Sequence, residues 1–240
     1  MNKDTRIAVC GYAGDQHYII KALGNYLQHR CPVVVLSPED SPAEIRYPGI
    51  ENRFAGKRAY IGQESLDRQR LHLQELLKFP ENHFLIHDSD SICLSPELPK
   101  YLYDEPDRVW SNLVNDDIPE HEAEFSTRPG WPHVAFQPPY FLSRKTIEAL
   151  LSVADHPGAK ASPVMPFIDF YMVQLTMLAG LSYRRFPHCV SCSDHPSMCG
   201  HQIMENQVRD DGAIFIHSVK REEVYQRLLA ARQEYLRNHP

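Results

Sequence analysis

The feature that most constrains the fold is an alternation of short apolar runs with a helical pattern near the start of the chain. Residues 6–10 and 32–36 are apolar runs, and residues 15–29 between them carry apolar side chains at helical spacing. A strand, a helix and a second strand at this spacing form a βαβ unit, which requires a parallel sheet. We therefore expect an α/β fold with a mixed, mostly parallel central sheet and helices on both faces.

Later segments extend this expectation to the end of the chain. Further strands are predicted at 83–87, 134–136, 140–142 and 212–217, and helices at 65–77, 145–153, 169–180 and 221–237. Residues 41–63 and 188–201 are predicted as loop or irregular structure. No internal repeat and no low-complexity linker interrupts the 240 residues, so we expect a single domain over 1–240.

Composition and charge narrow the class of protein. The net charge of −6 is not the signature of a protein held on nucleic acid mainly by phosphate contacts. The chain has no run of about 18 apolar residues and no signal-peptide pattern at its start, which predicts a cytoplasmic protein without a membrane span. In that compartment the six cysteines are expected to be thiols.

Two carboxylates follow the run 83–87, separated by a single residue. Asp88 and Asp90 come at the carboxyl end of the predicted strand, where ligands bind in open α/β sheets. Carboxylate oxygens suit Mg²⁺ or Mn²⁺, and substrate phosphates often complete the coordination of such ions. A solvated acidic turn would give the same pair, but the apolar runs on both sides favour a metal site over that alternative.

A second functional interpretation competes for the same pair. Phosphohydrolases of the haloacid dehalogenase (HAD) type carry an Asp-x-Asp after an apolar strand, usually the first strand of the fold. In this chain about 80 residues of βαβ-type pattern come before the pair. Asp116-Asp117 or Asp210-Asp211 could serve as the later acidic motif of that family, so this alternative stays open.

The order of elements and the acidic pair together resemble the GT-A glycosyltransferases. The resemblance implies a Rossmann-like GT-A fold with a nucleotide-sugar-binding half at about 1–95 and an acceptor-binding half at about 96–240. In that family a late His often completes the metal site and a nearby Lys contacts the diphosphate. His217 and Lys220, released by the apolar strand 212–217, match this arrangement. A surface His and Lys at a strand end is the alternative.

The resemblance also suggests where the nucleotide binds. The turn after the first strand would present Tyr12 for stacking on the base, and Ser37 and Asp40 after the second strand would frame base and ribose. Arg68 shares a helix face with His72, four residues away, and a basic residue on this helix commonly faces the nucleotide in the family. For Tyr12, Ser37 and Asp40, ordinary turn chemistry explains the residues equally well.

The acceptor side carries one carboxylate in a strongly apolar segment. Asp169 lies among Phe, Ile, Tyr and Met residues, where an unpaired acid is costly. It is either the general base of an inverting transferase or the N-cap of the helix that follows. Trp131 could provide a platform for a sugar, and the Cys- and His-rich segment 188–201 could bind zinc, although its spacing has no regular second pair.

These observations predict a metal-dependent glycosyltransferase that moves a hexose-type sugar from a nucleoside diphosphate-sugar to an acceptor hydroxyl. The acceptor would be a glycan, a protein or a modified base. An HAD-like phosphohydrolase and a non-catalytic nucleotide-sugar-binding module are the alternatives. The sugar, the base and the stereochemistry are left open by the sequence.

Overall fold

The structure is a computed structural model in which residues 4–28, 30–59, 62–95, 98–114, 135–159, 168–186, 188–191, 200–217 and 219–239 are described. The strands are β1 (Thr5–Cys10), β2 (Val33–Ser37), β3 (Ile50–Phe54), β4 (His83–Asp88), β5 (Ile92–Cys93), β6 (Arg108–Val114), β7 (Ala135–Ser143), β8 (Ser182–Arg185), β9 (Cys189–Ser191) and β10 (Phe215–His217). The α-helices are α1 (Gln16–Gln28), α2 (Gln63–Leu76), α4 (Arg144–Ser152), α5 (Ile168–Leu178), α6 (Gly200–Asp211) and α7 (Glu222–Asn238).

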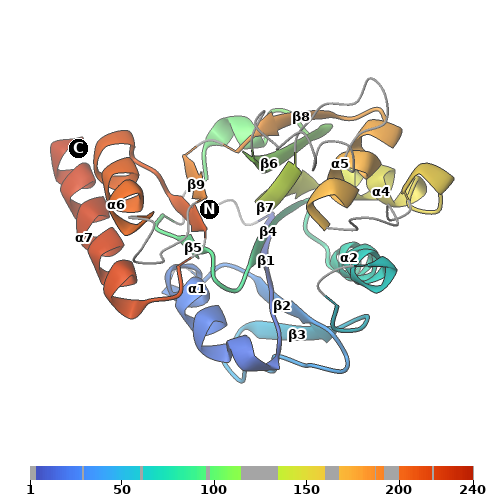
Figure 1. Cartoon of the computed structure of the whole chain (residues 1–240), viewed down its shortest axis with the longest axis horizontal. Helices are drawn as coiled ribbons and strands as arrows, with labels where there is room; N and C mark the ends of the chain where they lie inside the picture. The colour runs from blue at the N-terminus through green and yellow to red at the C-terminus, as the bar shows by residue number, and fades with distance from the viewer. Residues whose placement is uncertain are drawn as a thin grey trace.

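The centre of the molecule is a seven-stranded sheet in the order β3-β2-β1-β4-β7-β6-β8. The pairs β2–β3, β1–β2, β1–β4 and β6–β8 are parallel, whereas β7 runs antiparallel to both β4 and β6. Helices cover both faces, with α2, α4 and α5 on one side and α1 on the other (Figure 1). The predicted α/β fold with a mixed, mostly parallel sheet is confirmed.

The apolar strand runs are explained by burial on both faces of this sheet. Along β1, Ile7 and Val9 pack on the side of α1, and Ala8 packs on the side of α2, and all three are fully buried. A strand that is covered on both faces is apolar at nearly every position, so its sequence is a nearly continuous apolar run rather than an alternation. This is why short runs such as 32–36 were recognisable as central strands.

A second, three-stranded sheet lies beside the first and has the order β5-β10-β9. Strand β10 pairs antiparallel with β5 and parallel with β9, and α6 and α7 pack on the sheet through a separate apolar cluster. The sheet joins the segment directly after β4 to a strand more than a hundred residues later. It therefore brings the end of the chain to the carboxyl end of β4.

Two of the predicted loop regions contain strands. Residues 50–54, expected as loop, form the edge strand β3, which makes His83–Asp88 the fourth strand and not the third. An edge strand is half exposed and needs few apolar side chains, so the sequence 50–54 shows no strand pattern. The segment 188–201 contains the short strand β9, and helix α6 begins at its end.

The two strands predicted at 134–136 and 140–142 are one strand, β7. The sequence Gln137-Pro138-Pro139 separates the two apolar runs, and proline cannot donate a hydrogen bond to a ladder. In the β6–β7 register Asn112 pairs with Gln137 and Ser111 pairs with Tyr140, so Pro138 and Pro139 have no partner on β6. The prolines thus occupy a bulge, which β-sheets tolerate without ending the strand.

Among the described residues, no helix combines the length and the apolar character that crossing a membrane requires.

Candidate metal and nucleotide site

The carboxyl ends of β1 and β4 open into a cleft of about 550 Å³. Its walls come from the turn after β1, the inward face of α2, the turn after β4, strand β7 and the segment around β10. Parallel strands place their carboxyl ends at one edge of the sheet, and this is the edge at which α/β proteins bind ligands. The acidic pair lies in this cleft, as the sequence predicted.

Asp88 is the last residue of β4, and Asp90 lies in the turn that leads to β5. The turn is closed by a hydrogen bond from the Ser91 backbone N–H to the Asp88 carbonyl, 3.1 Å. The Val219 N–H donates to the Asp90 carbonyl at 2.7 Å, which ties the same turn to the chain after β10. Both carboxylates line the cleft, and both are partly buried.

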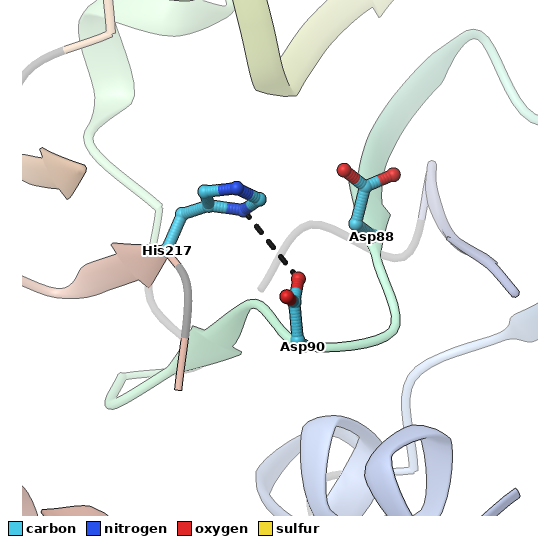
Figure 2. A group of neighbouring side chains, drawn as sticks. All are labelled: Asp88, Asp90 and His217. Carbon is cyan, nitrogen blue, oxygen red and sulfur yellow. Dashed lines mark ion pairs between the residues drawn. The ribbon is translucent and has the colours of Figure 1, made fainter. Parts of the chain in front are cut away.

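His217, the last residue of β10, faces the two carboxylates from the opposite side (Figure 2). The pairing of Ile216 with Ile92 sets this position, because it places the end of β10 beside the start of β5. One ligand atom from each of Asp88, Asp90 and His217 lies within 4.8 Å of the other two, close enough for a single ion to contact all three. His217 Nδ1 is 3.6 Å from Asp90 Oδ1, so the imidazole ring lies directly beside this carboxylate.

Burial in the cleft changes the protonation of the first acid. Removal from water raises the pKa of Asp88 to about 6, and the Asp90 carboxylate adds to the increase, while His217 and Arg68 oppose it. Desolvation and like charge both disfavour an ionised carboxylate that has no cation beside it. A divalent ion between the acids would remove this cost, so the protonation behaviour of Asp88 fits a metal ligand.

Lys220 also reaches the acidic pair. Its Nζ lies 3.6 Å from Asp90 Oδ2, on the carboxylate oxygen opposite the one that faces His217. The ammonium lines the cleft and is about half exposed. A flexible cation at the rim of a metal site can contact an anionic ligand bound there.

Two of the residues predicted for the nucleotide line the same cleft. Arg68 is buried on α2, and its Nη1 donates to the Tyr12 hydroxyl at 2.7 Å and to the Ala59 carbonyl at 2.6 Å. The guanidinium carbons of Arg58 and Arg68 lie 5.0 and 5.3 Å from the centre of the Tyr12 ring. Arg70 instead pairs with Asp155 outside the cleft.

Ser37 and Asp40 are not brought into the described lining of the cleft. Ser37 is fully buried, and its hydroxyl accepts a hydrogen bond from the Ala43 N–H at 3.0 Å. Asp40 is exposed and accepts from the Arg58 N–H at 2.7 Å. Both interactions hold the loop that follows β2, which is the turn chemistry that the sequence left open as the alternative.

Several predictions fall on residues or side chains outside the description. Helix α5 begins at Ile168, so Asp169 lies within its first turn and not at the N-cap, but its side chain is not described. Trp131, Asp116-Asp117 and most of the Cys- and His-rich segment, 192–199, lie outside the described residues. Asp210 and Asp211 end α6, are exposed and do not line the cleft.

The structure adds residues that sequence reasoning missed. Asp15 lines the cleft, and its Oδ2 accepts hydrogen bonds from the Tyr12 N–H at 2.9 Å and from the Ser89 hydroxyl at 3.2 Å. Ser91 Oγ lies 2.8 Å from His217 Nδ1 and fixes the orientation of that ring. In the run Asp88-Ser89-Asp90-Ser91, each acid therefore lines the cleft, and each serine makes a hydrogen bond to a residue distant in the sequence. No local pattern identifies the partners of the serines, because both are distant in sequence.

Comparison with protein families found no match to the chain, and comparison with curated proteins found none either.

Proposed function

We propose that the protein is a metal-dependent glycosyltransferase that transfers a sugar from a nucleoside diphosphate-sugar to an acceptor hydroxyl. The observation that carries this proposal is the convergence of Asp88, Asp90, His217 and Lys220 in one cleft that also contains Tyr12 and Arg68. An acidic cation site beside cationic and aromatic side chains suits a ligand with a diphosphate at one end and a planar base at the other.

Each group has a defined part in this proposal. Asp88, Asp90 and His217 would hold the ion, and the mixed carboxylate and imidazole ligands favour Mn²⁺ over Mg²⁺, which prefers oxygen ligands. A bound divalent ion would stabilise the negative charge that develops on the departing nucleoside diphosphate. Lys220 would add a point charge to the diphosphate, and Tyr12 and Arg68 would bind the nucleotide.

The acceptor hydroxyl needs a base in an inverting reaction, and we propose Asp169 for that part. The start of α5 approaches the cleft, because Gln69, which lines it, donates from Nε2 to Met172 Sδ at 3.8 Å. Asp169 lies in the first turn of this helix, and a carboxylate is one of the groups that serve as general bases. The acceptor we propose is a glycan, a protein or a modified base.

We also propose that the enzyme acts in the cytoplasm. The four cysteines described form no disulfide with one another, which accords with a reducing compartment; they are Cys10, Cys31, Cys93 and Cys189.

The test is a thermal-shift screen of nucleoside diphosphate-sugars with and without Mn²⁺. We expect one nucleotide class to stabilise the protein only when Mn²⁺ is present, and Asp90→Asn to abolish that shift. Release of the nucleoside diphosphate from the same donor would then separate an enzyme from a binding module. Hydrolysis of simple phosphomonoesters without any nucleotide-sugar effect would instead support the HAD-type phosphohydrolase and refute the proposal.

A further inference from the structure

The loop that carries the acidic pair is fastened to the turn that would bind the nucleotide. Asp15 Oδ2 is shared by two donors, the Tyr12 backbone N–H at 2.9 Å and the Ser89 hydroxyl at 3.2 Å. Ser89 lies between Asp88 and Asp90 in the sequence, so a hydrogen bond that fixes Ser89 also restricts the positions of both carboxylates. A single carboxylate oxygen thus connects the two halves of the cleft.

A second contact holds the same two segments together. Gly11, at the start of the turn, packs so closely on the loop that a side-chain Cβ at this position would lie 3.2 Å from Ser89 Cβ and 2.8 Å from Ile19 Cδ1. Close approach of two backbone segments is a common reason for glycine. The turn and the loop therefore behave as one packed unit whose polar connection is Asp15.

The remaining contacts of Asp15 indicate that it is not itself a metal ligand. Its backbone N–H donates to the Tyr12 carbonyl at 2.8 Å, which closes a short 3₁₀ turn at residues 13–15 directly before α1. Its side chain lines the cleft but is not one of the three groups close enough to share an ion. Asp15 is therefore placed to orient the metal ligands and not to be one of them.

We propose that Asp15 is a positioning residue that couples the nucleotide-binding turn to the metal loop through Ser89. This inference rests on the proposed metal and nucleotide site and deepens it. When a ligand settles against Tyr12, the turn and Asp15 are held in place, and the hydrogen bond to Ser89 holds Asp88 and Asp90 in their ligating positions. Binding of the nucleotide and of the ion would then favour each other through the protein, in addition to the direct contact of phosphate with metal.

Variants at both ends of the hydrogen bond separate its effect from the charge of Asp15. Asp15→Ala removes the bond and the charge, Ser89→Ala removes only the bond, and Asp15→Asn removes the charge and keeps an acceptor oxygen. The affinity of the full chain for Mn²⁺ is measured by electron paramagnetic resonance titration. Each variant is titrated without nucleotide and again with the nucleoside diphosphate that gives the Mn²⁺-dependent thermal shift. Ser152→Ala, which deletes an exposed hydroxyl at the end of α4, is the matched control.

We expect Ser89→Ala to weaken Mn²⁺ binding by about threefold to tenfold, which is the usual net effect of one ordinary hydrogen bond. In the Asp15→Ala background, adding Ser89→Ala should cause no further loss of Mn²⁺ affinity, because the hydrogen bond is already absent. Asp15→Asn should keep most of the nucleotide-dependent gain in Mn²⁺ affinity, because it retains an acceptor oxygen. Additive losses in the double variant, or wild-type affinity in Ser89→Ala, would overturn the coupling while leaving the metal site intact. Absence of Mn²⁺ binding in the wild type would remove the metal site and this inference together.

Discussion

The Asp88→Asn variant gives the most informative test of the electrostatics, because it should stabilise the protein while it destroys the site. An unfolded Asp titrates at about 3.9, whereas burial and the Asp90 carboxylate raise the pKa of Asp88 in the fold to about 6. The folded state therefore holds the proton more tightly than the unfolded state. The stabilising effect of a protonated Asp88 is complete below about pH 4 and is lost as the pH rises through about 6.

The size of the effect follows from this difference in pKa. A pKa raised by about 2 corresponds to about 3 kcal/mol of stability lost at pH 8, at about 1.4 kcal/mol for each pH unit. Because Asp88 is only partly shielded from the solvent in the cleft, we expect about half of that, about 1–2 kcal/mol. For a chain of this size the corresponding rise in the unfolding midpoint is about 2–8 °C.

The assay is urea unfolding of wild type and Asp88→Asn in a chelating buffer at pH 8 and at pH 5. We expect the variant to be more stable at pH 8, and its advantage to be about half as large at pH 5. Saturating Mn²⁺ should reverse the order, since only the wild type gains binding energy. Asp104→Asn, which alters an exposed carboxylate outside the cleft, is the control. A variant less stable than wild type at pH 8 in the chelator would refute the reasoning.

Three further predictions concern the site. Ser91→Ala should lower the Mn²⁺ affinity about tenfold, because His217 loses the hydrogen bond that orients it, and an unchanged titration would contradict this role. Lys220→Met should bind Mn²⁺ alone about twofold to fivefold more tightly, because a competing ammonium leaves Asp90. The same variant should bind the nucleoside diphosphate more weakly in calorimetry. Weaker binding of Mn²⁺ alone would argue against the competition. Asp169→Asn should leave donor binding unchanged and slow transfer by about 10²–10⁴-fold, and near-normal turnover would exclude it as the base.

The buried strands and the position of the acidic pair could be predicted from the sequence, because each depends on residues that are close together in the chain. Strands buried on both faces are apolar at nearly every position, which made 6–10, 32–36 and 83–87 visible as central strands. The position of Asp88 and Asp90 at the carboxyl end of the last of these follows from spacing alone. Edge strand β3 was not predicted, because it is partly exposed and its residues show no strand pattern. Strand β7 was predicted as two strands, because its continuity across the two prolines depends on its pairing with neighbouring strands.

The site as a whole depends on contacts between residues that are far apart in the chain. Pairing of β10 with β5 brings His217 and Lys220 to the acidic pair, and the packing of Gly11 on the loop brings Asp15 to Ser89. The family resemblance anticipated His217 and Lys220, but no pattern anticipated Asp15 or the role of Ser91. A hydrogen bond between distant residues leaves no periodicity in the sequence, and only the folded chain, by closing both sheets against each other, determines which side chains meet.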